Sequence, residues 1–171
     1  STVITENDFQ TIVTECIGGN CQDNVPIGCW NTSKVTDMSF AFNEIELFDD
    51  SINCWNTARV TDMSKMFYKA TDFNKPLDDW NVARVTTMGY MFREASNFNQ
   101  CLSTWADKTP PDVSVSNIFQ SSSCPNKDTA ASVGPWCQDK QCIAPSPSVD
   151  PSGSPSTTAS VTPSDVPSLD P

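Results

Sequence analysis

One sequence motif recurs at a fixed interval along the chain. Its consensus is W-N-x-x-[KR]-V-T-[DT]-M-x-x-[AM]-F, and it begins at Trp30, Trp55 and Trp80, which are 25 residues apart. A further, degenerate copy begins at Trp105. Repeats of this length bury their apolar side only by stacking on their neighbours, so the motif predicts a stack of coils with one continuous core.

Aligning the copies places apolar residues in columns. The six columns are Trp30, Trp55, Trp80 and Trp105; Val35, Val60 and Val85; Met38, Met63 and Met88; Phe42, Phe67 and Phe92; Phe48, Phe73 and Phe98; and Ile27, Ile52, Leu77 and Leu102. With coils stacked about 4.8 Å apart, each column becomes a buried stripe. We therefore expect these residues to form the core and not a cofactor site.

Each coil is expected to hold one short strand and one short helical turn. Apolar and polar residues alternate over residues 60–63, as in a half-buried strand, and Met63, Met66 and Phe67 then follow three-four spacing. A period of about 20 to 29 residues is typical of leucine-rich repeats. The predicted fold class is a leucine-rich-repeat-like solenoid with a short strand and a short helical or 3₁₀ turn in each 25-residue coil.

The two ends of the chain differ from the repeats, and four parts are predicted. Residues 1–26 form an N-terminal cap, in which the segment 5–8 resembles an N-cap before one-sided apolar residues. We expect a capping helix there, with a partner-binding helix as the alternative. Residues 27–124 form the solenoid, 125–143 a cysteine-containing C-terminal cap, and 144–171 an extended Ser/Thr/Pro-rich tail or stalk.

The segment W-N-T-A-R-V-T-D-M-S-K-M-F-Y-K-A-T-D-F-N-K-P-L, at residues 55–77, resembles the BspA-type leucine-rich-repeat family of surface proteins. The resemblance covers roughly residues 26–124. Members occur as tandem arrays on secreted or cell-surface proteins of bacteria, protists and algae. The resemblance therefore implies an adhesive or structural role without a shared catalytic site.

Eight cysteines and no histidine favour disulfides over a zinc site. Cys29 and Cys54 share one column in successive coils, where the coil spacing suits the Cα separation of a disulfide, so we predict that they are bridged. Proximity in the sequence assigns the other pairs, although other connectivities stay open: Cys16 with Cys21, Cys101 with Cys124, and Cys137 with Cys142. Disulfides indicate an extracellular, secreted or cell-surface protein.

Glycans are predicted at one asparagine and along the tail. Asn31 begins an N-T-S sequon, although Asn31, Asn56 and Asn81 could instead form a ladder that satisfies the turn backbone. The tail resembles an O-glycosylated stalk, and its alternative role is to lie in a groove of its own or a neighbouring subunit. The predicted O-glycosylation sites are Ser146, Ser148, Ser152, Ser154, Ser156, Thr157, Thr158, Ser160, Thr162, Ser164 and Ser168.

The net charge of −11 disfavours nucleic acid and anionic membranes as partners. One basic column consists of Lys34, Arg59 and Arg84, and three residues after them stand Asp37, Asp62 and Thr87. The column is predicted either as an ion-pair ladder with these residues or as a ligand ladder for acidic glycans. We predict no metal site and no cofactor. The chain also contains no apolar run of the roughly 20 residues that a membrane span needs.

The absence of histidine and of a glycine-rich phosphate loop argues against an enzyme. We predict a non-enzymatic, secreted structural protein of an extracellular matrix, cell surface or filament, which assembles as a homo-oligomer or filament. The alternative is an adhesion or binding module for a glycan or protein ligand. The structural role is favoured because the array is short, cross-linked and tethered to a stalk, and because no column presents the exposed aromatic cluster that a sugar-binding face would use. Function is expected in what does not repeat: the caps, the cysteines and the tail.

Overall fold

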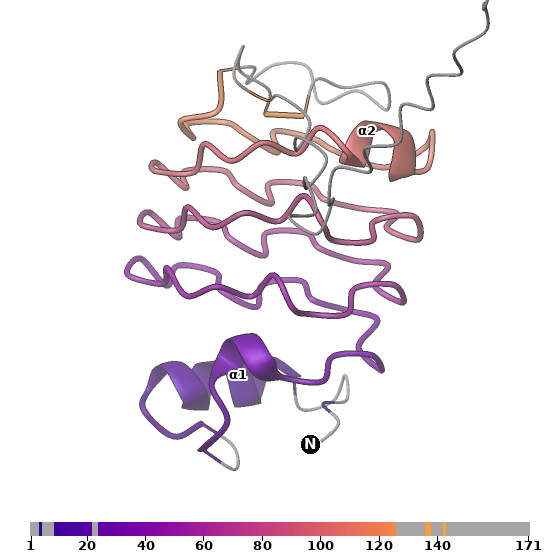
Figure 1. The fold of residues 1–171 in the computed structure, drawn as a ribbon. Coiled ribbons are helices and arrows are strands. Elements are labelled where there is room, and N and C mark those ends of the chain that lie inside the picture. The colour runs from indigo at the N-terminus through magenta and orange to yellow at the C-terminus, as the bar shows by residue number, and fades with distance from the viewer. Residues whose placement is uncertain (1–3, 5–8, 22–23, 126–135, 138–141, 143–171) are drawn as a thin grey trace, which may run out of the picture.

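The structure, a computed structural model, describes residues 4, 9–21, 24–125, 136–137 and 142. Over these residues the chain winds through stacked layers, and a helix lies at one end of the stack (Figure 1). Regular elements in this part of the chain are α1 (Phe9–Ile17), the 3₁₀ helix η3 (Ile27–Cys29) and α2 (Trp105–Lys108). We number the layers 1 to 4 by the tryptophans that begin them: Trp30, Trp55, Trp80 and Trp105.

The predicted tryptophan column is buried and stacked. The rings of Trp30 and Trp55 lie 6.2 Å apart with their planes 7° from parallel, and those of Trp55 and Trp80 lie 6.3 Å apart. The indole N–H groups of Trp55, Trp80 and Trp105 each donate to a backbone carbonyl 28 residues earlier. The one polar atom of each of these buried rings therefore has a partner.

Phenylalanine rings form a second stack in the core. The rings of Phe42, Phe67 and Phe92 lie 5.3 and 5.4 Å apart in successive layers. Each of them also lies 3.9–4.0 Å from the phenylalanine six residues later in its own layer. All of these rings are at most 5% exposed. The predicted apolar columns are therefore core, and each layer completes the burial of its neighbours.

The predicted leucine-rich-repeat solenoid, with a strand and a helical or 3₁₀ turn in every coil, is wrong. The described residues contain no named strand and no sheet, because pairing between layers is limited to isolated parallel bridges. These bridges are Asp37↔Asp62, Asp62↔Thr87 and Thr87↔Ser114. Residues 64–69, where three-four spacing predicted a helical turn, form tight turns without a helix.

Alternating hydrogen bonds explain why neither element forms. The backbone N–H groups of Lys65 and Phe67 donate to carbonyls of layer 3 at 2.9 Å. Those of Met66 and Tyr68 donate instead to the carbonyl three residues earlier, at 3.3 and 3.2 Å. A helix would keep all these bonds inside the segment, and a strand would direct them to neighbouring strands. This segment divides its donors between the two patterns.

Left-handed backbone recurs with the period of the repeat. Non-glycine residues with φ between 52° and 62° occupy two columns: Phe40, Lys65, Tyr90 and Asn117; and Glu44, Lys69, Glu94 and Ser121. The left-handed conformation costs a non-glycine residue about 1 kcal/mol or more, and it interrupts a helix after a single turn. Every side chain in both columns is exposed or half-buried, so these positions shape the surface of the stack.

The predicted N-terminal helix is present as α1, and it packs against layers 1 and 2. Phe9 is fully buried and meets the Trp55 ring edge to face at 5.4 Å, and Val13 is also fully buried. The side-chain amide of Gln10 donates to the carbonyl of Ser39 in layer 1. The predicted N-cap segment, residues 5–8, lies outside the described residues.

Gly28→Ala is expected to destabilise the protein by about 1–3 kcal/mol, the usual cost of overpacking. A Cβ at Gly28 would lie 2.2 Å from the backbone carbonyl oxygen of Ser51, so the backbone would have to move. The matched control is Gly89→Ala, whose Cβ would meet nothing closer than 3.9 Å. Alanine there is expected to leave stability unchanged or raise it by about 0.4–1 kcal/mol. Equal losses for the two variants in urea unfolding would contradict the close approach at Gly28.

Candidate functional site

The side chains of the basic column, which was predicted as a ligand ladder, are exposed and form no ion pair with the described residues. Lys34, Arg59 and Arg84 take part in none of the three ion pairs that the described residues form. The carboxylates of Asp37 and Asp62 accept the backbone N–H two residues on, at 2.8 and 2.7 Å. The predicted ion-pair ladder is therefore absent from this part of the chain.

A different group of cations lies among aromatic rings. We call this surface the aromatic face, and it consists of Phe40, Lys65, Tyr68, Lys69, Tyr90 and Arg93. The six residues come from layers 1, 2 and 3. Cation–ring contacts connect all of them, so they form one continuous patch.

Two cations of the aromatic face each contact two rings. Lys65 Nζ lies 5.2 Å from the centroid of the Phe40 ring and 5.9 Å from that of Tyr90. The Arg93 guanidinium carbon lies 5.5 Å from the centroid of Tyr90 and 5.9 Å from that of Tyr68. Separations within about 6 Å allow cation–π attraction, worth roughly 0.5–1 kcal/mol at exposed sites. The cations therefore help to hold the rings in fixed positions.

Two carboxylates border the aromatic face. Lys69 Nζ donates to Glu44 at 3.0 Å, and Arg93 Nε donates to Glu94 at 3.2 Å. The hydrogen bond and the charge of Glu44 raise the pKa of Lys69, so this cation stays protonated. Lys65 belongs to none of the ion pairs in the described part of the chain. Lys69 and Arg93 of the aromatic face are therefore paired with carboxylates. The ammonium of Lys65 instead lies near the rings of Phe40 and Tyr90.

Sequence reasoning missed the aromatic face, in which Phe40 is exposed and Tyr68 and Tyr90 are half-buried. The residues occupy positions of the repeat that differ from copy to copy. Phe40, Lys65 and Tyr90 share one such position, and Tyr68 and Arg93 share another. The available signal was this variation inside a motif whose core positions are nearly constant.

The side chains of the three asparagines after the tryptophans form hydrogen bonds within their own turns. The side-chain oxygens of Asn31, Asn56 and Asn81 each accept the backbone N–H two residues on, at 3.1–3.2 Å. Bonds between layers come instead from threonines such as Thr32, whose hydroxyl donates to the Asn56 carbonyl at 3.1 Å. Asn31 is half-buried, so its glycosylation stays a prediction. The predicted O-glycosylation sites and the rest of 144–171 lie outside the described residues.

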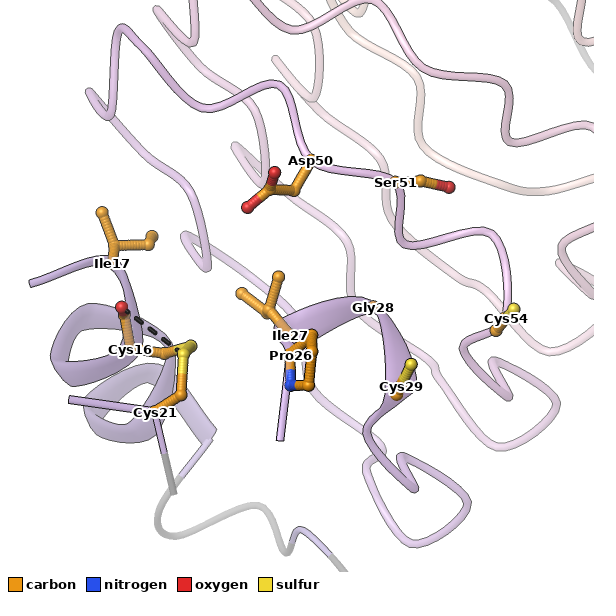
Figure 2. A pocket seen from close by; sticks show the side chains of 10 residues that line it. All are labelled: Cys16, Ile17, Cys21, Pro26, Ile27, Gly28, Cys29, Asp50, Ser51 and Cys54. Carbon is orange, nitrogen blue, oxygen red and sulfur yellow. Dashed lines mark hydrogen bonds between the residues drawn. A yellow bond between two sulfur atoms is a disulfide. The ribbon is translucent and has the colours of Figure 1, made fainter. Parts of the chain in front are cut away.

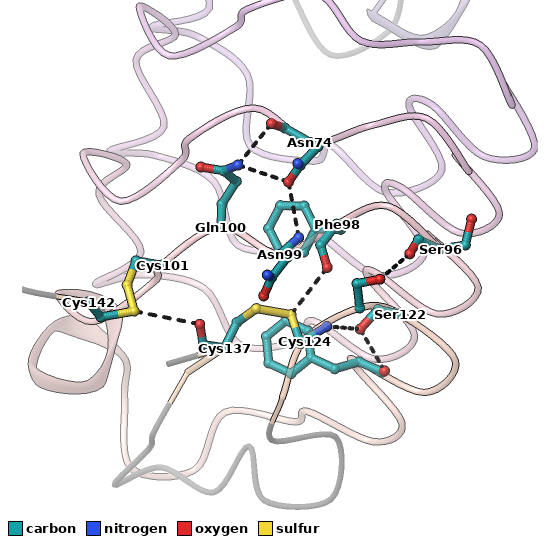
Figure 3. The surroundings of a disulfide bond; sticks show 12 residues. Asn74, Ser96, Phe98, Asn99, Gln100, Cys101, Ser122, Cys124, Cys137 and Cys142 are labelled. Atoms are coloured by element: carbon teal, nitrogen blue, oxygen red, sulfur yellow. Dashed lines mark hydrogen bonds between the residues drawn. A yellow bond between two sulfur atoms is a disulfide. The ribbon is translucent and has the colours of Figure 1, made fainter. Parts of the chain in front are cut away.

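Three disulfides are present: Cys16–Cys21, Cys101–Cys142 and Cys124–Cys137. The first is the predicted pair. The predicted Cys101–Cys124 and Cys137–Cys142 pairs are wrong, because Cys137 lies beside Cys124, with a Cα separation of 4.9 Å, and Cys142 lies beside Cys101, at 5.7 Å (Figure 3). Distance along the sequence misled the assignment because Cys137 and Cys142 each lie beside a cysteine of the stack that is far away in the sequence.

The residue before Cys137, Trp136, covers the last layer of the stack. Trp136 is fully buried, and its ring lies 5.9 Å from Trp105 and 6.5 Å from Phe119. Its carbonyl accepts the backbone N–H of Leu102 at 3.2 Å. A non-repeating tryptophan therefore covers the last layer and places Cys137 at the rim of the core.

Cys29 and Cys54 are exposed free thiols, so the bridge that their shared column predicted is not formed in the structure. Both line a pocket of about 540 Å³ (Figure 2). Apolar residues from the end of α1 and from η3, including Ile17 and Ile27, form much of its wall. Asp50 adds a carboxylate.

The described residues include neither a metal-binding cluster nor a membrane-spanning helix. No group of three or more His, Cys, Asp or Glu side chains in this part of the chain could hold a metal ion. The helices described here are all too short or too polar to cross a membrane.

Comparison with known proteins gives one match. No curated protein and no solved structure shows significant similarity to the chain. One family, described as a Mycoplasma protein of unknown function, DUF285, matches residues 8–132, which is more than half of the 171 residues. The match identifies this family and not the BspA-type family that the repeat resembles. The matched segment includes α1 and all of the tryptophan-led layers, and the chain belongs to the DUF285 family.

Proposed function

We propose that this chain is a non-enzymatic, secreted or cell-surface binding module that recognises a glycan through the aromatic face. One observation carries the proposal: rings and cations from three successive layers meet in one surface patch. Phe40 in this patch is 45% exposed, whereas the rings of the core columns are at most 5% exposed. Tyr68 and Tyr90 are half-buried. Apolar and aromatic groups gathered in one surface patch are a common feature of ligand-binding sites.

The chemistry of the aromatic face suits a sugar. The flat rings of Phe40 and Tyr90 match the C–H faces of a pyranose, and a tyrosine keeps a hydroxyl for hydrogen bonding. Lys65 donates hydrogen bonds to ligand hydroxyl or acidic groups, and Glu44 accepts them. Aromatic and arginine side chains also supply much of the affinity at many binding surfaces. The face therefore favours the binding role over the structural, filament-forming role predicted from the sequence.

Two further features support a place at the cell surface. Disulfides such as Cys124–Cys137 form and persist in oxidising compartments. The repeat resembles that of BspA-type surface proteins, and the Ser/Thr/Pro-rich composition of residues 144–171 suits a glycosylated stalk. A stalk would display the aromatic face away from the cell.

A glycan array carrying neutral and acidic sugars, probed with the full chain, tests this proposal. At least one sugar class is expected to bind saturably. Phe40→Ala combined with Tyr90→Ala is expected to weaken that binding about 10- to 100-fold, because losing an aromatic anchor commonly costs more than about 1 kcal/mol. Unfolding midpoints of the variants check that the fold is intact.

Two triple variants with equal charge changes separate the aromatic face from general electrostatics. Replacing Lys65, Lys69 and Arg93 by alanine is expected to weaken binding. Replacing the exposed column Lys34, Arg59 and Arg84 by alanine removes three cations from the same stack and is expected to leave binding unchanged. An array without any bound sugar would refute the proposal, and so would equal losses for both triple variants.

A further inference from the structure

Two free thiols occupy the same position in successive turns of the stack. Cys29 ends η3, just before layer 1, and Cys54 stands just before layer 2. Both are exposed, although the other six cysteines form three disulfides. Both side chains are among those that line the pocket (Figure 2).

Neighbouring contacts indicate how close the Cα atoms of the two cysteines are. The residues that follow them, Trp30 and Trp55, have rings 6.2 Å apart with planes 7° from parallel. The residue before Cys29 is Gly28, whose position leaves no room for a Cβ against Ser51. The Cα atoms of the two cysteines are therefore about one layer spacing apart, roughly 5–6 Å, which a disulfide tolerates.

The pocket beside the thiols has room for a small molecule. Its volume is about 540 Å³, and its lining includes Ile17, Pro26 and Ile27 as well as both cysteines. Asp50 and Ser51 supply polar groups on the layer 1 side. A substituent on either thiol would therefore lie next to the apolar wall of the pocket and next to hydrogen-bonding groups.

We propose that Cys29 and Cys54 form a dithiol site that reacts with low-molecular-weight disulfides by thiol–disulfide exchange. One cysteine thiolate attacks a sulfur of the small disulfide; a protein–ligand S–S bond forms, the ligand's own S–S bond breaks, and one half leaves as a thiolate. The second cysteine thiolate then attacks the bonded protein sulfur. An S–S bond between Cys29 and Cys54 forms, and the other half of the ligand leaves. Each departing thiolate takes up a proton that a cysteine thiol has released.

The product joins the residue just before layer 1 to the residue just before layer 2. The small disulfide is reduced to two thiols and the protein dithiol is oxidised, so no further reagent is needed. This site is independent of the aromatic face, because it uses none of the same residues.

Oxidised glutathione and the full chain provide the test. After brief treatment with limiting phosphine, which reduces the most accessible bridges first, the protein is incubated with oxidised glutathione and analysed by intact mass and peptide mapping. The unchanged chain is expected to form the Cys29–Cys54 bridge and to release both halves as glutathione. Cys54→Ser is expected to retain one glutathione at Cys29, and Cys29→Ser to retain one at Cys54. The double variant is expected to retain none.

Two results would overturn the proposal. The first is that the unchanged chain keeps glutathione without forming the bridge, which would show that the thiols cannot meet. The second is that the single variants take up no glutathione although iodoacetamide alkylates the remaining thiol in the folded protein. A bridge already closed in the isolated protein supports the proposal if the limiting phosphine opens it before the other three disulfides.

Discussion

Phe67→Ala is expected to lower the free energy of unfolding by about 3–5 kcal/mol, the usual cost of removing a buried aromatic ring. Phe67 is fully buried in the middle of the phenylalanine stack. Its ring lies 5.3 Å from Phe42, 5.4 Å from Phe92 and 4.0 Å from Phe73, so three layers lose contacts at once. Urea unfolding monitored by tryptophan fluorescence measures the change.

The matched control for this variant is Phe40→Ala. Phe40 carries the same ring at the surface of layer 1, where it is 45% exposed, and its main aromatic-face contact is to Lys65. We expect a loss below about 1 kcal/mol, which is the scale of an exposed cation–π contact. A loss at Phe40 as large as that at Phe67 would show that the aromatic face is part of the core.

Removing the Cys124–Cys137 bridge by a double alanine substitution is expected to cost about 2–5 kcal/mol. Both residues are at most 1% exposed, and the bridge closes a sequence separation of 13. In the unfolded chain the bridge limits the conformations of this loop, and in the folded chain it holds Trp136 near Trp105. Thermal unfolding of the variant under non-reducing conditions measures the loss.

The Cys16–Cys21 bridge supplies the comparison. It closes a separation of only 5 residues, and the entropy removed from the unfolded chain grows with the logarithm of loop length. A double alanine variant there is expected to lose about 1 kcal/mol less than the Cys124–Cys137 variant. Peptide mapping that recovered Cys101 linked to Cys124 would contradict the pairing on which this comparison rests.

The buried columns could be predicted from the sequence because burial restricts residue type. Tryptophan, phenylalanine, methionine, valine and isoleucine or leucine recur at the buried positions of the motif, and the helix α1 follows from its one-sided apolar pattern. The local backbone could not be predicted in the same way. Residues 60–70 carry both a strand-like and a helix-like pattern, and the chain satisfies both by dividing its hydrogen bonds between the turn and the next layer.

The left-handed backbone positions of the repeat could not be predicted from the residue types. Lys65 and Tyr90 stand where glycine would be expected for φ near 53° and 61°. The aromatic face was missed for a related reason, since its residues vary between copies and only the stacking of layers brings them together. The C-terminal disulfides depend on Cys137 and Cys142 lying beside cysteines of the stack, which distance along the sequence does not encode.

The spacing of the contacts between layers has a consequence for how the protein folds. Side-chain hydrogen bonds between layers join residues 24 to 30 positions apart, as with Thr57 and Asn81 or Lys108 and Asp78. Adding a layer to a folded neighbour therefore closes a loop of nearly constant length each time, so the entropic cost of each addition is similar. The folding of one layer onto the next does not require contacts with a distant part of the chain. Folding can therefore spread from any pair of adjacent layers in either direction.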